Sequence, residues 1–170
     1  MTHPLIPQLR FARSEFQRAL DGITAEEAVK RLMPMNCMSW MIAHLGRQEQ
    51  DYWLIKAQGK ILVPEVREWA ASGGPATTPP LAEAWQAWHT IIAAVDPYLD
   101  TLTTDVLLTH YVTDGQRHWE SIGTQIRRTT YHYFYHIGES QAIRQLMGHQ
   151  NVGDFVGHIG DEAPYIPETR

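Results

Sequence analysis

The chain has 170 residues, a length that favours one domain spanning residues 1–170, and its hydrophobic and charged fractions of 44% and 19% are typical of globular proteins. A net charge of −5 with scattered Lys and Arg argues against nucleic-acid binding, which calls for a basic face. No stretch approaches the roughly 20 apolar residues that cross a bilayer, and the single cysteine and the lack of a leader-like start predict a cytoplasmic protein without a membrane partner.

The N-terminal part of the chain predicts two amphipathic elements. Between residues 5 and 20 apolar side chains recur at three- and four-residue spacing, which predicts a helix. Its charged residues are expected to point largely outward; they are Arg10, Arg13, Glu15 and Arg18. A short helix to about residue 32 is indicated by Thr24 and Glu27, which can form a capping box.

A long helix is expected next, from about residue 37 to 58, with Asn36 as its N-cap and Gly59 as its stop. Its stripe through His44 and Gln48 mixes polar and apolar residues, which is unusual for a plain core stripe. Residues 60–80 then form a connection rich in turn residues. It is long enough to cross a bundle from end to end rather than to make a tight hairpin.

The second half of the chain predicts two further helices. One starts after Thr78 and weakens or kinks near Pro97. Residues 105–120 fit either a small hairpin or an irregular loop, and the pattern does not decide between them. Residues 121–147 predict the fourth helix, and residues 149–170 an extended C-terminal tail. Four main helices predict an all-α fold, a four-helix bundle.

Two histidines of the fourth helix carry the strongest chemical signal. His132 and His136 stand four residues apart, so their imidazoles lie on one helix face, close enough to hold one metal ion. With His44 they would supply three neutral nitrogen ligands, a usual catalytic zinc set that also suits nickel, iron(II) and cobalt(II). Glu139 could accept a hydrogen bond from a ligating imidazole or from metal-bound water. The pair alone also fits a plain helical scaffold with buried, hydrogen-bonded histidines.

Polar neighbours on the same stripes are candidates for substrate-binding or supporting roles. Gln125 and Arg128 share the face of His132 and could receive an anionic part of a substrate or thiol. A closed, structural metal site would need a fourth protein ligand. The candidates for it are Gln48, Asp51 and Glu139.

The residues around these histidines resemble the DinB family of metal-dependent helical bundles. The likeness rests on W-M-I-A-H-L-G-R-Q-E-Q-D-Y-W around His44 and on Y-H-Y-F-Y-H-I-G-E-S-Q-A-I-R-Q-L-M-G around His132 and His136. It implies an up-down-down-up four-helix bundle, often a homodimer. It also implies one divalent metal, zinc or nickel before iron, held by these three histidines. Many members continue with His-Arg-Gly-Gln after the last ligand, whereas this chain has Ile-Gly-Glu at 137–139.

The resemblance also implies a class of chemistry. Characterised relatives include thiol-cofactor-dependent transferases and a mycothiol-dependent maleylpyruvate isomerase. We therefore expect a metal-dependent enzyme for a small-molecule substrate, a thiol-dependent S-transferase or isomerase or a hydrolase, with a low-molecular-weight thiol as possible second cofactor. The alternative is a non-catalytic stress-related or interaction bundle with a structural metal. Candidates for a dimer surface are Trp53, Trp69 and Trp119.

Overall fold

The computed structural model describes residues 2–168, and these residues are mostly helical. Contacts along the chain divide it into two compact units. The first unit comprises Met1–Asp21 and Leu99–Arg170, and the second comprises Gly22–Tyr98. Within residues 2–168, no helix has the length and apolar character needed to span a membrane. The single domain and the four-helix bundle topology stay predictions.

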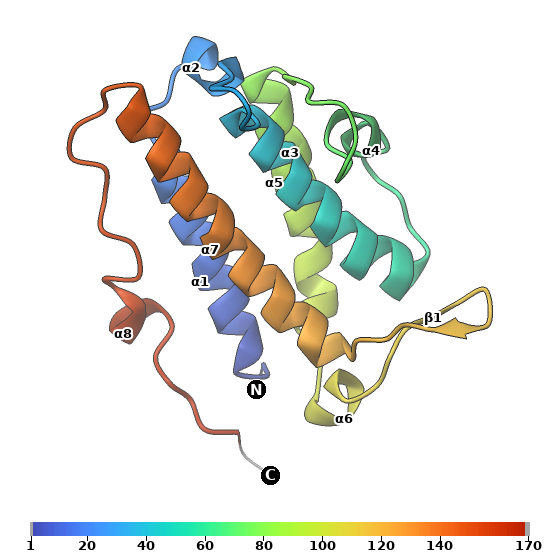
Figure 1. Cartoon of the computed structure of the whole chain (residues 1–170). Helices are drawn as coiled ribbons and strands as arrows, with labels where there is room; N and C mark the ends of the chain where they lie inside the picture. The colour runs from blue at the N-terminus through green and yellow to red at the C-terminus, as the bar shows by residue number, and fades with distance from the viewer. Residues whose placement is uncertain (1, 169–170) are drawn as a thin grey trace. The chain divides into compact units, whose positions relative to one another are not determined.

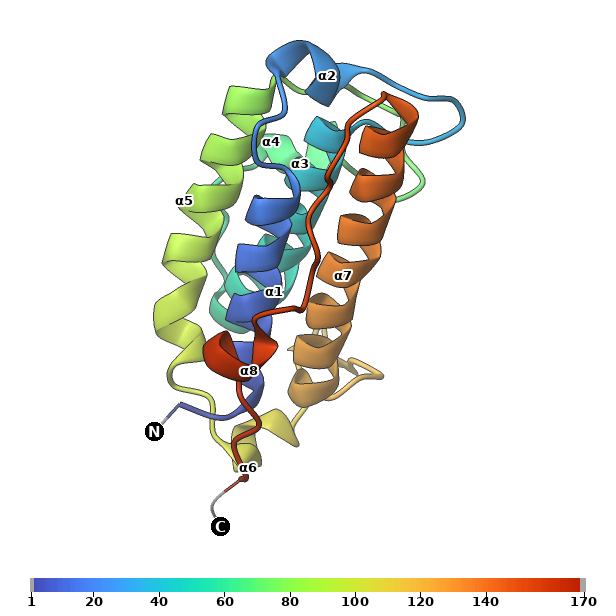
Figure 2. The same cartoon turned by 90° about the vertical axis from the view of Figure 1, so that its left-hand side faces the viewer.

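Two long helices dominate the first unit. They are α1, Leu5–Ala19, and α7, Ile122–Leu146, and they lie side by side (Figures 1 and 2). Ser121 caps α7 by accepting the N–H of Thr124, and Gly148, at φ 92°, follows its C-terminal end. Both ends of the predicted fourth helix are thereby confirmed to within one residue.

The contact between α1 and α7 is aromatic. The ring centroids of Phe16 and Tyr133 lie 5.6 Å apart in an edge-to-face arrangement, and those of Phe11 and Phe134 lie 6.3 Å apart. Phe16 and Tyr133 are fully buried, so this pair forms the centre of the first unit's core.

The chain before α7 contains a short helix and a hairpin. The helix α6 spans Thr104–Leu107, and β1, Val112–Thr113, pairs antiparallel with β2, Gln116–Arg117. The two turn residues, Asp114 and Gly115, both have positive φ, at 51° and 74°, which is the backbone of a two-residue hairpin turn. Of the two alternatives that the sequence left open for this stretch, the hairpin is correct.

The C-terminal segment lies along α1 and is not extended throughout (Figure 2), since it contains the short helix α8, Ile159–Glu162. The carboxylate of Glu15, a residue only 1% exposed, accepts the N–H of Val156 at 2.7 Å and Nη2 of Arg18 at 2.7 Å. The same Nη2 donates to the carbonyl of Asp154 at 2.6 Å. The expectation that Glu15 points into solvent is wrong, because the C-terminal segment covers it.

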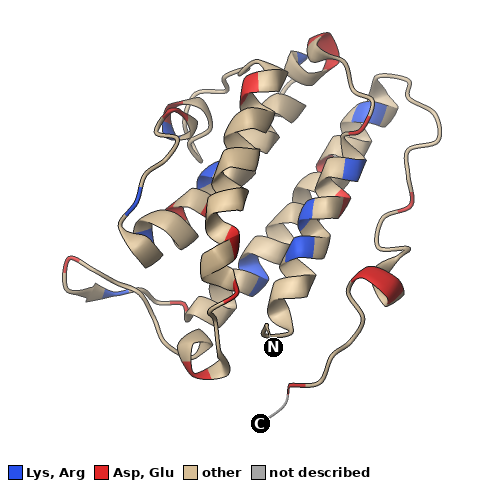
Figure 3. Cartoon of the chain, turned by 180° about the vertical axis from the view of Figure 1, so that it is seen from behind, with Lys and Arg blue, Asp and Glu red and all other residues tan. Residues whose placement is uncertain are grey.

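Charge is spread along α1, where Figure 3 shows several basic positions. Burial alone would raise the pKa of Glu15, but hydrogen bonds from Arg18 and from the N–H of Val156 hold it below its ordinary value. The hydrogen bond to Glu15 in turn raises the pKa of Arg18. Arg13 was also expected to point outward, yet it is only 4% exposed, whereas Arg18 is exposed as expected.

The second unit contains the remaining helices. They are α2 (Ala25–Val29), α3 (Met38–Glu49), the π-helix η1 (Gln50–Lys56), α4 (Glu65–Trp69) and α5 (Leu81–Leu99). The capping box between Thr24 and Glu27 is confirmed. The long helix expected after it is α3 continued by η1, with Cys37 rather than Asn36 as N-cap. Gly59, at φ 66°, follows as predicted.

A glycine brings α3 and α5 close together. A Cβ atom on Gly46 would lie 3.4 Å from Cα of Trp88 and 3.6 Å from Cδ1 of Ile91. Trp88 and Ile91 are fully buried, so this is a core contact of the second unit. Trp53, a candidate for a dimer surface, is also fully buried, and that expectation is wrong.

The connection between η1 and α5 is held by side chains of η1. Oε1 of the fully buried Gln50 accepts the N–H groups of Leu62 and Val63, both at 2.9 Å, and its Nε2 donates to the carbonyl of Val63 at 2.9 Å. Asp51 pairs with Arg67 of α4 at 3.4 Å. The connection is therefore ordered, and it contains the short helix α4.

Candidate metal centre

His132 and His136 face each other on α7, in the first unit. Their Nε2 atoms are 3.0 Å apart, and His136 is only 5% exposed. Metal–nitrogen bonds of about 2.0–2.1 Å place two ligand nitrogens of one ion roughly 3 Å apart. The spacing of the two imidazoles therefore suits a shared cation.

Glu139 determines which nitrogen of His136 is available. Its Oε2 lies 2.8 Å from Nδ1 of His136, so Nδ1 carries the proton and donates it. Nε2 then presents its lone pair toward His132; this tautomer is assigned from the hydrogen bonds. A carboxylate behind a ligating imidazole orients the ring and raises its basicity.

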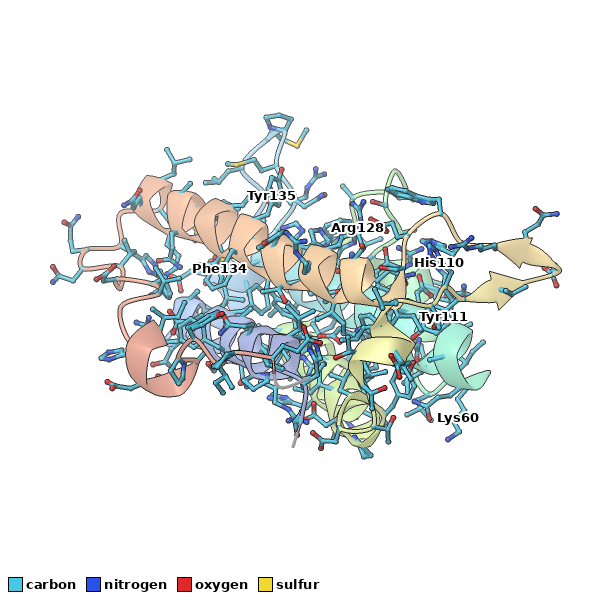
Figure 4. The ribbon with its side chains drawn as sticks, turned by 90° about the horizontal axis from the view of Figure 1, so that it is seen from below. Lys60, His110, Tyr111, Arg128, Phe134 and Tyr135 are labelled. Carbon is cyan, nitrogen blue, oxygen red and sulfur yellow. The ribbon has the colours of Figure 1, made fainter. Side chains whose placement is uncertain are left out.

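An exposed tyrosine lies against both imidazoles. The ring centroid of Tyr135 is 5.1 Å from that of His136, edge to face, and 6.4 Å from that of His132. Figure 4 shows Tyr135 on the side of α7 opposite Phe134, which packs on α1. Tyr135 thus covers part of the histidine pair from the solvent side.

The imidazole of His44, in the second unit, is also oriented by a hydrogen bond, in this case to the backbone. Its Nδ1 lies 3.1 Å from the carbonyl oxygen of Ala70, just after α4, so Nδ1 donates and Nε2 keeps the lone pair. The ring is 6% exposed, and Trp40 stacks on it at 4.4 Å between centroids and 12° between planes. No sequence pattern marks Ala70, because its contribution is a main-chain oxygen.

The residues expected to receive a substrate anion make contacts within the first unit. Nε of Arg128 lies 2.8 Å and 3.0 Å from the two carboxylate oxygens of the buried Glu120, and its guanidinium lies 5.3 Å from the exposed ring of Trp119. Gln125 is fully buried, and its Nε2 donates to Nδ1 of His118 at 3.2 Å. Gln125 and Arg128 therefore hold the end of the hairpin segment against α7. No local sequence pattern indicates Glu120 as the partner of Arg128.

The candidate fourth ligands also have structural roles. Asp51 pairs with Arg47 at 3.3 Å and with Arg67 at 3.4 Å, and Glu139 lies behind His136. Gln48 is half-buried, one turn after His44. These contacts make the two carboxylates supporting groups for their neighbours.

Comparisons with known proteins bear on the family alone. Among curated proteins, no match to the chain is found. A family model described as the DinB superfamily matches residues 8–140, a span that includes all three histidines and Glu139 and stops before the C-terminal segment. Because that match covers well over half of its length, the chain belongs to the DinB superfamily.

Proposed function

We propose that the protein binds one divalent metal ion through Nε2 of His44, His132 and His136. The observation that carries this proposal is the 3.0 Å separation of the Nε2 atoms of His132 and His136, with Glu139 on the far nitrogen of His136. We propose His44 as the third neutral imidazole, since its Nδ1 is already engaged and its Nε2 is left to bind a metal ion. Three imidazoles suit zinc or nickel, and also iron(II).

A divalent cation lowers the pKa of a water or thiol that it binds, and so supplies a nucleophile at neutral pH. The chain's own groups orient the ligands: the carboxylate of Glu139 holds His136, and the carbonyl of Ala70 holds His44. We propose a metal-dependent enzyme acting on a small molecule, a thiol-dependent transferase or isomerase or a hydrolase. Membership of the DinB superfamily supports this class. A thiol cofactor, a homodimer and a cytoplasmic location stay predictions.

One observation favours the alternative of a non-catalytic protein with a structural metal. Arg128 is paired with the buried carboxylate of Glu120, and Gln125 bonds His118, so the two expected substrate-binding residues already support the fold. A protein of this second kind would bind metal but would bind neither a small anion nor a thiol at that metal.

Elemental analysis of freshly purified protein tests the metal site. We expect about one divalent ion per chain in the wild type and a large loss in His132→Ala, since two of the three nitrogens cannot hold a divalent ion as tightly. His158→Ala is a matched control, because His158 is exposed in the C-terminal segment. If His132→Ala held one ion per chain as tightly as the wild type, the assignment would be wrong.

A further inference from the structure

Trp40 combines two features that do not ordinarily occur together in a core residue. It is 6% exposed, and its Nε1 has no hydrogen-bond partner among the described residues. At the same time its ring stacks on His44, with 4.4 Å between centroids and 12° between planes. A buried donor without an acceptor is costly to a fold, so its retention calls for a physical reason.

We propose that the indole N–H of Trp40 donates a hydrogen bond to an anionic group that binds beside His44, the thiolate or oxyanion of a substrate or thiol cofactor. This inference rests on the proposed metal function of His44. The near-parallel stack holds the indole ring of Trp40 directly against the imidazole of His44, so a group bound at the free nitrogen of that imidazole would lie beside the indole ring. An anion is the favoured acceptor, because hydrogen bonds to charged acceptors are the strong ones.

Trp53 offers a matched control within the same unit. It is fully buried, and its Nε1 also lacks a hydrogen-bond partner among residues 2–168. Its ring lies edge to face against Tyr52, with 5.6 Å between centroids. The two tryptophans thus share residue type, burial and an unpaired donor, whereas Trp40 has the stacked imidazole.

The first arm of the experiment uses metal-free protein. Trp40→Phe keeps an aromatic ring against His44 and removes the N–H. Removal of the unpaired donor should stabilise the fold, whereas the smaller ring should destabilise it slightly. We therefore expect a melting temperature equal to or above that of the wild type once the loss of ring area is taken into account. Trp53→Phe should behave in the same way. Metal stoichiometry of both variants should match that of the wild type.

The second arm titrates azide into cobalt(II)-loaded protein and follows the visible absorption of the cobalt. Trp40→Phe should bind azide about tenfold or more weakly than the wild type, and Trp53→Phe should bind it equally well. Equal azide affinity in Trp40→Phe and wild type, or no azide binding by the loaded wild type, overturns the inference. In either of these azide results, one metal ion per chain in the wild type would leave the proposed metal function standing. A wild type that binds no metal overturns the proposed function and this inference together. Loss of metal in Trp40→Phe also overturns the inference, because the indole would then support His44 and not the anion.

A measurement on the unaltered chain keeps the inference testable if Trp40→Phe does not fold. In zinc-loaded protein, the indole N–H of Trp40 can be assigned by its nuclear Overhauser contacts to the His44 ring. Azide should move this proton resonance downfield and leave that of Trp53 in place. An unchanged Trp40 resonance at saturating azide overturns the inference.

Discussion

Removal of the carboxylate of Glu139 should weaken metal binding without unfolding the protein. The carboxylate accepts the Nδ1–H of His136 at 2.8 Å, and its side chain is 22% exposed. Loss of such an outer partner typically costs about 10–100-fold in metal affinity, or roughly 1.4–2.7 kcal/mol. Partial exposure places Glu139 toward the lower end, so we expect about a tenfold loss in Glu139→Ala. Glu139→Gln keeps an acceptor but no charge, and should lose only a few-fold.

Competition for zinc with a chromophoric chelator measures these affinities directly. Glu83→Ala serves as a control, because Glu83 is an exposed acid on α5 and its loss should leave zinc affinity unchanged. Zinc affinity should decrease in the order wild type, Glu139→Gln, Glu139→Ala. This order is expected if the side chain at 139 accepts a hydrogen bond from a metal-binding imidazole. Zinc binding by Glu139→Ala as tight as that of wild type would refute the reasoning, and so would an equal loss in Glu83→Ala.

Two further predictions concern the two units. The pKa of Glu15 is lowered in the folded protein, so its contribution is present above the unfolded pKa of about 4.3 and is lost as pH falls through the folded pKa. Glu15→Gln should therefore reduce the loss of unfolding free energy between about pH 5 and pH 2, measured by urea unfolding. Substitution of the exposed Glu26 by Gln should not change this loss. Parallel pH curves for Glu15→Gln and the wild type would contradict this reasoning. At Gly46, the added Cβ of alanine meets Trp88 at ordinary contact distance, so Gly46→Ala should be neutral or stabilise by up to about 1 kcal/mol, whereas Gly46→Leu should cost about 1–3 kcal/mol by overpacking. Thermal melts of the pair check this, and a Leu variant as stable as the Ala variant would disprove the close packing.

The main helices were predictable because most of their ends are encoded locally. The capping box of Thr24 and Glu27, the N-cap Ser121 and the glycine after η1 each act within a few residues, so a single sequence reveals them. The hairpin before α7 could not be decided in advance, because its strands are two residues each and have too little pattern. The resemblance to the DinB family is confirmed by the family match.

Burial was predictable only where neighbours in sequence decide it. The helical pattern places Glu15 on the solvent side of α1, yet Val156 covers it from 141 residues away. Trp53 was expected as a candidate for a dimer surface, yet the packing of the second unit buries it fully. At the candidate site the spacing of His132, His136 and Glu139 indicated their contact, since one helix holds all three.

The hydrogen-bond acceptor for His44 is a main-chain oxygen, so the path of the backbone and not a side chain orients the imidazole. Any residue type at position 70 supplies the same carbonyl, so side-chain substitutions there leave the imidazole's partner in place. The length of the connection between η1 and α5 brings this carbonyl oxygen to 3.1 Å from Nδ1 of His44. A one-residue deletion in the connection would turn the carbonyl away from the imidazole. The orientation of this imidazole therefore depends on the length of the connection rather than on its side chains. Alanine substitutions along the connection would leave this hydrogen bond in place and would not reveal its role.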